Sequence, residues 1–185
     1  MIHYLKNIPL ESDTPINFKE IVIGAGCFWG VEKKFWDLPG VYLTLVGYSG
    51  GDTSDPTYED VCYKITNHAE VVKIIYDPKI IDLKDLLKVF WECHDPTQGM
   101  RQGNDVGTQY RSAIYTLDDS DLKLANKTKD IYQSQLEKSN LNKITTEICR
   151  IKNFYIAEEY HQQYLAKNPN GYCGIGGTGC AFPKQ

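Results

Sequence analysis

The stretch Ile21-Val-Ile-Gly-Ala-Gly-Cys-Phe-Trp-Gly30 joins a strand-like run to a helix-like run, with a cysteine at the junction. Its β-branched residues followed by two glycines predict a strand that ends in a tight turn. From residue 28 onward the apolar residues recur at helical spacing, at Phe28, Val31, Phe35 and Leu38. Cys27 is therefore expected at the start of a helix.

The position of Cys27 allows two interpretations. At a helix start, unpaired backbone N–H groups and the positive end of the helix dipole favour a thiolate, which would make Cys27 a nucleophile. A free cysteine is also frequently buried, so a small side chain that fills the joint between strand and helix is the alternative. The local pattern leaves both interpretations open.

Composition limits the class of protein. The chain has 185 residues, of which 42% are hydrophobic and 24% charged, which predicts one globular domain with a substantial core. The formal net charge of -4 gives no electrostatic footprint for nucleic acid or an anionic membrane surface, so neither partner is predicted. No apolar run is long enough to span a bilayer.

Cysteine usage indicates the compartment. The first residues lack a basic segment followed by a long apolar run, so no secretory signal is predicted. Six cysteines without such a signal point to a reducing compartment, and we expect a cytoplasmic protein. In that setting thiols are reactive, metal-bound or inert, and structural disulfides are not expected.

The order of predicted elements indicates the fold class. Residues 41–46, 69–76 and 110–115 have the composition of strands. A helix capped by Asp82 follows the second of these, because its apolar residues recur at positions 83, 86, 87, 90 and 91. Together with residues 21–38, the order strand, helix, strand, strand, helix, strand predicts an α+β fold of the split βαβ (ferredoxin-like) kind, a two-layer structure with helices on one face of the sheet.

The remaining chain extends this unit. Ser120 is expected to cap a third helix, with Leu124, Thr128, Ile131 and Tyr132 on one side. A strand near residues 144–151 and a helix near 157–165 follow. Residues 1–20 are predicted to be an arm that the domain ties down, and residues 166–185 a mobile glycine-rich tail. We see no internal repeat or linker, so residues 1–185 are predicted to form a single catalytic domain.

The glycine-rich tail carries two cysteines, Cys173 and Cys180. A mobile pair of thiols suits thiol exchange, and the seven residue steps between them span at most roughly 24 Å. One thiol can then visit a buried site while the other stays in solvent. The alternative is a surface tail with two incidental thiols.

Metal binding and protease chemistry compete with this interpretation. The six cysteines contain no C-x-x-C pair and the histidines no helical pair, so no metal site is predicted. A cysteine protease would pair Cys27 with a histidine, for which His68 and His94 are candidates. Glu70 lies two residues after His68 in a predicted strand, so both side chains face the same way and the acid is a further candidate.

Several blocks resemble one family in order along residues 20–180. They are Gly26-Cys-Phe-Trp-Gly30, Pro56-Thr-Tyr-Glu59, His68-Ala-Glu-Val-Val72 with Tyr76-Asp-Pro78, His94-Asp-Pro-Thr-Gln-Gly99, Arg101-Gln-Gly-Asn-Asp105, Gly107-Thr-Gln-Tyr-Arg-Ser112 and Gly171-Tyr-Cys-Gly174. Together they resemble the A-type peptide methionine sulfoxide reductases. The family usually has glycine at the position of Asn67, and asparagine also tolerates a positive φ.

The resemblance implies reduction of methionine S-sulfoxide, free or in proteins, to methionine. In this interpretation Cys27 attacks the sulfoxide sulfur and Glu70 supplies the proton that the oxygen needs. Tyr58 and Tyr110 would donate hydroxyl hydrogen bonds to the oxygen, and Asp105 would orient that part of the site. No cofactor is implied.

The resemblance also implies a substrate wall and a thiol relay. Phe28 and Trp29 would hold the S-methyl group, with Trp29 the better candidate because it lies outside the helical stripe. Cys173 would condense with the sulfenic acid on Cys27, and Cys180 would pass the disulfide to thioredoxin. We expect a monomer.

Two other classes remain open at this point. A thioredoxin-like disulfide oxidoreductase would also use mobile cysteines, although it would need the absent C-x-x-C motif. A non-enzymatic protein that binds oxidised methionine would need the aromatic pocket without the thiol relay.

Overall fold

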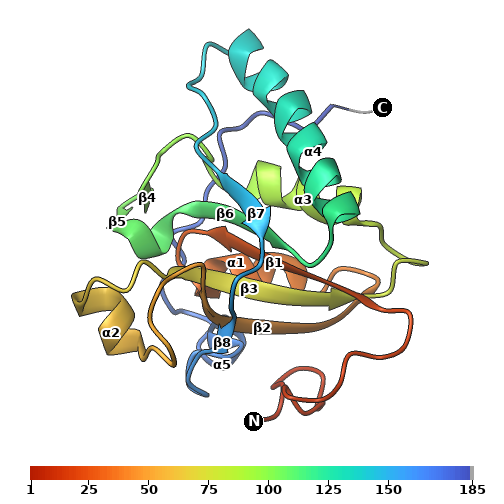
Figure 1. Ribbon diagram of the computed structural model, residues 1–185, viewed down its shortest axis with the longest axis vertical. Coiled ribbons are helices and arrows are strands. Elements are labelled where there is room, and N and C mark those ends of the chain that lie inside the picture. The colour runs from red at the N-terminus through yellow and green to blue at the C-terminus, as the bar shows by residue number, and fades with distance from the viewer. Residues whose placement is uncertain (184–185) are drawn as a thin grey trace.

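A six-stranded sheet with the strand order β7-β6-β1-β3-β2-β8 organises the computed structural model, which describes residues 1–183 (Figure 1). Its strands are β1 (Lys19–Ala25), β2 (Val41–Ser49), β3 (Ala69–Tyr76), β6 (Ser112–Thr116), β7 (Glu147–Arg150) and β8 (Tyr155–Ile156). The helices are α1 (Phe28–Phe35), α2 (Tyr58–Tyr63), α3 (Leu83–Cys93), α4 (Asp119–Lys138) and α5 (Tyr164–Lys167). A small sheet of β4 (Arg101–Gln102) and β5 (Asp105–Val106) precedes the 3-10 helix η1 (Thr108–Tyr110).

Strand β1 lies inside the sheet, antiparallel to both β3 and β6. Strand β2 is antiparallel to β3, so β1 and β2 run in the same direction on either side of it. Strand β7 pairs in parallel with β6 at one edge, and β8 pairs with β2 at the other. The predicted α+β class is confirmed.

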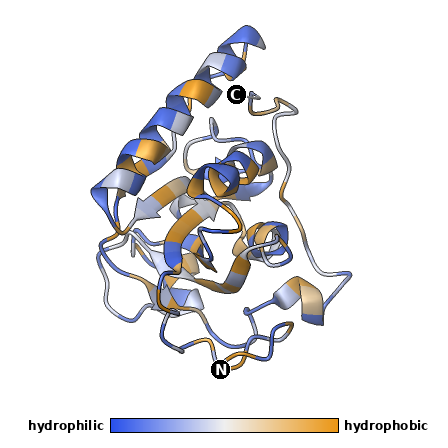
Figure 2. Ribbon diagram, turned by 90° about the vertical axis from the view of Figure 1, so that its right-hand side faces the viewer, coloured by the Kyte–Doolittle hydropathy of each residue, from blue (hydrophilic) through white to orange (hydrophobic). Residues whose placement is uncertain are grey.

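Alternation along β1 divides the buried side chains between the two faces of the sheet. Ile21 and Ile23 join the largest apolar cluster, to which α1, α3 and α4 contribute, whereas Val22 belongs to a cluster on the opposite face. Figure 2 shows apolar residues concentrated in the strands and spaced along an otherwise hydrophilic α4. The N-terminal arm contributes buried Leu10 to a third cluster.

Two helix starts illustrate local sequence control. Asp82 caps α3, because its carboxylate accepts a hydrogen bond from the Asp85 backbone N–H at 2.9 Å, as predicted. For α4 the predicted cap is wrong: Asp118 accepts from the Asp121 N–H, and the Ser120 hydroxyl donates to Asp118. A carboxylate at the preceding extended residue is the stronger acceptor.

Other predicted elements need correction. The helix expected over residues 157–165 is reduced to α5, and residues 159–163 form turns. The strand expected from residue 110 begins at Ser112, because Tyr110 belongs to η1. Helix α2 was not predicted, although Thr57 and Asp60 form a capping box at its start. Asn67 has φ 58°, which confirms that it adopts the expected left-handed conformation.

The C-terminal tail runs as a coil over α1, α3 and α4. A side chain built at Gly177 would meet the Glu92 carbonyl oxygen at the end of α3, so the tail backbone lies directly on that helix. Beyond it, buried Phe182 stacks on Tyr132 of α4 with ring centroids 6.1 Å apart. Residues 184 and 185 of the predicted tail lie outside the described residues, and mobility of the tail stays a prediction.

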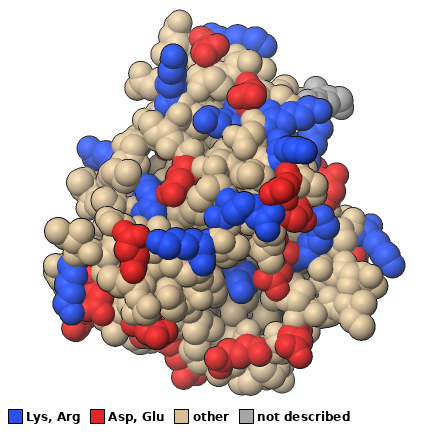
Figure 3. All heavy atoms as spheres, in the orientation of Figure 1, with Lys and Arg blue, Asp and Glu red and all other residues tan. Residues whose placement is uncertain are grey.

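The distribution of charged side chains and the lengths of the helices describe the surface of the protein. Figure 3 shows acidic and basic side chains interspersed over the face in view. Within residues 1–183, no helix is both long and apolar enough to cross a membrane.

Candidate active site

The junction between β1 and α1 places Cys27 at the helix N-cap, as predicted. Gly26 turns the chain with φ +97°, and a Cβ at this position would lie 2.8 Å from the Gln102 side chain. Glycine is therefore required on both conformational and steric grounds. Cys27 is half-buried, and its side chain makes no capping hydrogen bond.

A cavity of about 240 Å³ opens at this junction. It is lined by Cys27, Phe28, Trp29, Tyr58, Glu70, Asp105, Tyr110 and Tyr172. The structure thus brings together every predicted site residue except the two tail cysteines, and it adds Tyr172. The lining comes from α1, α2, β3, β5, η1 and the tail, which are distant in sequence.

Glu70 is the buried acid of the cavity. It lies in β3 opposite Tyr48 of β2, and only 2% of its surface is exposed. The Phe28 backbone N–H donates to Oε2 at 3.0 Å. Burial raises the pKa of Glu70 to about 8, although this N–H acts in the opposite direction. The carboxyl therefore holds a proton at neutral pH.

The helix start was expected to favour a thiolate at Cys27, and this expectation is wrong for the protein without substrate. Burial and the neighbouring Glu70 raise the pKa of the thiol to about 12, despite the backbone N–H groups of Trp29 and Gly30 at the helix start. Desolvation thus outweighs the helix terminus. A protonated Glu70 carries no charge, so its repulsion of a thiolate is absent while it keeps its proton.

Two tyrosines face the same cavity as hydroxyl donors. Burial raises the pKa of Tyr58 and of Tyr110, so both hydroxyls keep their protons at neutral pH. Tyr58 begins α2, and its backbone N–H donates to Glu158 at 2.8 Å. Tyr110 ends η1, where the Arg111 guanidinium donates to the Thr108 carbonyl at 3.0 Å.

Asp105 and Tyr172 close another side of the cavity. The Tyr172 hydroxyl donates to the Asp105 carboxylate, at 3.1 Å from Oδ1 and 3.2 Å from Oδ2. This bond ties the tail to β5. Tyr172 was missed as a site residue, although it stands beside Cys173 in one of the family-like blocks.

The apolar wall is formed by adjacent aromatic residues. Phe28 is 1% exposed and serves both the core and the cavity. Trp29 is half-buried and stacks on Tyr164, with ring centroids 3.8 Å apart and planes at 16°. Its indole N–H donates to His161 Nδ1 at 3.0 Å. His161 and Tyr164 were not predicted as site residues, because their segment was expected to be helical.

The tail cysteines lie outside the cavity lining. A Cβ built at Gly30 would lie 3.2 Å from Cys173 Sγ, so this exposed thiol rests against α1 one turn beyond Cys27. Cys180 instead lies at the end of α4, where its thiol donates to the Ser139 hydroxyl at 3.3 Å. All six cysteines are free.

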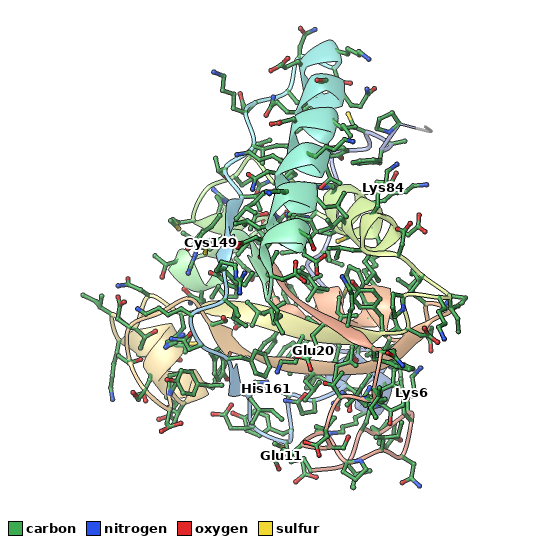
Figure 4. The ribbon with its side chains drawn as sticks, turned by 45° about the vertical axis from the view of Figure 1, so that its right-hand side comes forward. Lys6, Glu11, Glu20, Lys84, Cys149 and His161 are labelled. Atoms are coloured by element: carbon green, nitrogen blue, oxygen red, sulfur yellow. The ribbon has the colours of Figure 1, made fainter. Side chains whose placement is uncertain are left out.

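The remaining cysteines have structural surroundings. Cys93 is buried and donates to the Phe90 carbonyl, and Cys149 packs against the opposite face of the sheet from α1. Figure 4 shows Cys149 on β7, away from His161. Cys62 lies on α2, one turn after Tyr58.

The candidate histidines do not line the cavity. His94 is fully buried between the Phe90 carbonyl and the Ser112 hydroxyl. His68 bonds to the backbone of Gly51 and Thr53. Neither arrangement supports a Cys–His pair. Over residues 1–183, no group of three or more metal-ligating side chains is arranged to hold an ion.

Comparison with known proteins gives a consistent match. The family model "Peptide methionine sulfoxide reductase" matches residues 19–179. Peptide methionine sulfoxide reductase MsrA of Photobacterium profundum is 59% identical over 181 residues, which cover 97% of this chain and 86% of the relative.

Solved structures agree with this match. Methionine sulfoxide reductase A of Corynebacterium diphtheriae has a TM-score of 0.85 and 42% identity, covering 98% of this chain and 89% of that one. Mxr1 from Saccharomyces cerevisiae in complex with Trx2 has a TM-score of 0.55 and 31% identity, covering 83% and 88%.

Proposed function

This chain belongs to the peptide methionine sulfoxide reductase family, and we propose that its cavity reduces the S epimer of methionine sulfoxide, free or in proteins, to methionine. The observation that carries the proposal is the juxtaposition of a cysteine at a helix start with a buried acid that keeps its proton. A sulfoxide oxygen is a poor leaving group until it is protonated, so reduction needs both groups.

The shape of the cavity supports recognition of one epimer. The sulfoxide sulfur carries a methyl group, an oxygen and the methionine side chain. Phe28 and Trp29 offer an apolar wall for the methyl group, whereas Tyr58, Tyr110 and Glu70 offer donors for the oxygen. With Cys27 opposite the sulfur, only one handedness satisfies all three contacts, and the family resemblance implies the S epimer.

In the first step Cys27 sulfur attacks the sulfoxide sulfur while Glu70 donates its proton to the oxygen. The oxygen passes to Cys27, the thioether of methionine leaves, and the proton of the Cys27 thiol restores Glu70. In sum, thiol and sulfoxide become sulfenic acid and thioether. The Cys27 sulfur loses the two electrons that reduce the sulfoxide sulfur.

In the second step the Cys173 thiol condenses with the sulfenic acid on Cys27, forming a disulfide and releasing water. The contact of Cys173 with Gly30 supports this order, because the thiol already rests one helical turn from Cys27. Cys180 then attacks Cys173, which frees the Cys27 thiol and moves the disulfide outward. Because the Cys180 thiol is bonded to Ser139 at the end of α4, the tail has to move before Cys180 can attack Cys173.

The dithiol of thioredoxin would reduce the Cys173–Cys180 disulfide. The yeast relative solved in complex with Trx2 supports this class of reductant. Electrons thus pass from thioredoxin to the tail, from the tail to Cys27, and from Cys27 to the substrate.

The test is turnover of a methionine sulfoxide peptide with thioredoxin and its reductase. We expect Cys27→Ser to lose turnover, because a serine hydroxyl is far less ionised and less nucleophilic than a thiol. Cys149→Ser is the matched control and should keep it. Turnover near that of the wild type in Cys27→Ser would refute Cys27 as nucleophile.

A further inference from the structure

Four consecutive residues, three that follow β8 and the first residue of α5, contact Trp29 in the first turn of α1 or anchor the residues that do. Residues 161–164, here called the Trp29 brace, run beside β8 below the sheet, where His161 is labelled in Figure 4. His161 accepts from the Trp29 indole and Tyr164 stacks on its ring. The first three residues of the brace are each at most 1% exposed.

The brace is itself pinned to the scaffold. The Gln162 side chain bonds to both backbone groups of Val46 in β2, at 2.9 and 2.8 Å. Gln163 adopts a left-handed conformation with φ 47°, and its backbone N–H and side-chain amide donate to buried Glu32 of α1 at 2.8 and 2.7 Å. The position of His161 is therefore set by a sheet strand and by α1, independently of any ligand.

The hydrogen bond to Trp29 fixes the tautomer of His161. An indole N–H can only donate, so Nδ1 must be unprotonated, and the neutral ring carries its hydrogen on Nε2. Nε2 is buried without a hydrogen-bond partner, and the Glu158 carboxylate lies 3.9 Å from it. That charge favours a hydrogen on Nε2 and leaves Nδ1 free to accept.

Glu158 also connects the two halves of the cavity. Its Oε1 accepts from the backbone N–H of Tyr58, and its Oε2 accepts from the Tyr48 hydroxyl at 2.8 Å. The His161 ring lies 4.6 Å from the Tyr58 ring and 5.1 Å from the Phe28 ring. One carboxylate thus supports Tyr58, which would donate to the sulfoxide oxygen, and, through His161, the aromatic wall that would contact the methyl group.

We propose that His161 is a positioning residue for substrate binding, which acts by holding the Trp29 indole in the cavity. This inference rests on the proposed function. Trp29 would contact the methyl group both before and during the reaction. A misoriented indole therefore weakens the binding of the ground state and of the transition state to the same extent. KM should then rise while kcat changes little.

The central comparison is His161→Leu against His161→Asn. Leucine removes the acceptor, whereas the Asn Oδ1 can occupy the place of Nδ1 and accept from the indole. We expect His161→Leu to raise KM for methionine sulfoxide about tenfold with kcat within about twofold, and His161→Asn to restore most of the loss. An unchanged KM in His161→Leu would overturn the proposal.

A double-mutant cycle tests whether His161 acts through Trp29. Trp29→Phe has no N–H to hold, so His161→Leu should add little to KM in that background. The same further rise in KM with and without the indole would overturn the proposal. His94→Leu, which removes a buried histidine that does not line the cavity, controls for general destabilisation and should leave KM unchanged.

Two outcomes separate the inference from its premise. If the wild-type protein forms no methionine, the proposed function fails; if it is active and His161→Leu matches it, only the positioning role fails. Should His161→Leu not fold, His161→Gln replaces it. The longer Gln side chain carries its amide nearer the Nε2 position, so it should not rescue as Asn does, and equal KM values for the two amides would contradict the proposal.

Discussion

At the scale of single residues, Cys27 and Glu70 share a cavity in which burial opposes the ionisation of both, and a charged Glu70 would further oppose that of Cys27. The resting state therefore holds two neutral groups, a thiol and a carboxylic acid. A bound sulfoxide oxygen would accept the proton that Glu70 keeps, so the acid is active only while it is protonated.

The pH dependence of the first turnover follows from this state. Burial raises the Glu70 pKa to about 8, so the acid is available below that pH and is lost as pH rises through it. We expect the single-turnover rate of methionine formation to fall above about pH 8. A rate that rises steadily from pH 7 to 9 would instead indicate that thiolate formation alone controls the step.

Glu70→Gln tests the same proton directly. Glutamine keeps the size and hydrogen bonding of the side chain but has no transferable proton, so we expect methionine formation in a single turnover to slow at least about 100-fold. Glu20→Gln, at a carboxylate remote from the cavity, should keep the wild-type rate. Equal rates for Glu70→Gln and wild type would place the acid elsewhere.

Sequence reasoning named both residues and expected Glu70 to hold a proton, but it expected a thiolate at Cys27, whose pKa is raised in the folded protein. The junction between a strand-like run and a helix-like run identifies Cys27, and the family-like block at residues 68–72 identifies Glu70. Their pKa values depend on burial by chain segments far away in sequence, including the tail through Tyr172. A helix start favours a thiolate, and only the folded structure shows that desolvation outweighs this effect.

At the scale of elements, the close contact between α1 and the tail depends on Gly30. A Cβ there would lie 3.2 Å from Cys173 Sγ and 3.1 Å from Ile175. Gly30→Ala should push the tail away and slow loss of free thiols after the first turnover, measured by thiol titration. Gly176→Ala, with no atom within 4 Å of its Cβ, should behave as wild type.

The start of α4 gives a stability prediction. Asp118 caps the helix, whereas Ser120 bonds only to Asp118. We expect Asp118→Ala to lower the free energy of unfolding by about 1 kcal/mol, and Ser120→Ala to cost clearly less. Urea unfolding of both variants decides between them, and the reverse order would restore Ser120 as the cap.

The segment before α5 shows why one element was predicted wrongly. Its apolar spacing is helical, but the side chains of Gln162 and Gln163 bond to Val46 and Glu32, which are more than one hundred residues away. These bonds favour a turn with a left-handed residue. No local pattern contains them, whereas the apolar stripe of α3 needed only local information.

At the scale of the whole molecule, buried titratable groups should set the pH dependence of stability. Burial raises the pKa values of Glu32 and Glu70 from 4.5 to about 7 and about 8. Each binds a proton in the folded state that the unfolded state has lost, so their contribution falls as pH rises through these values. Burial lowers the pKa values of His3, His94 and His161 from 6.5 to about 4, which raises stability with pH only up to about 6.5.

Stability should therefore decline between pH 6.5 and 8, where the two glutamates dominate these five groups. Glu32→Gln should make this decline shallower, because glutamine does not titrate. The measurement is the free energy of unfolding in urea at several pH values under reducing conditions. A decline of wild-type steepness in Glu32→Gln would contradict the assignment.

The sheet topology explains why distant blocks meet. Strand β3 lies beside β1, so Glu70 faces the start of α1, and the turn before β6 brings Tyr110 to the same end. The order of β1, α1, β2, β3, α3 and β6 could be predicted from the sequence, whereas α2, β4, β5 and η1 between them were missed. The path of the tail could not be predicted, because its glycines fix no conformation and the contacts that place it are with α1, α3, α4 and β5.

The thiol relay as a whole is tested most directly by counting product. Fully reduced protein, freed of reductant, is mixed with excess methionine S-sulfoxide, and methionine formed per protein is measured. Because Cys180 frees Cys27 once, we expect about two equivalents for the wild type, about one for Cys180→Ser and none for Cys27→Ser. Methionine formed by Cys27→Ser, or none by the wild type, would contradict the account.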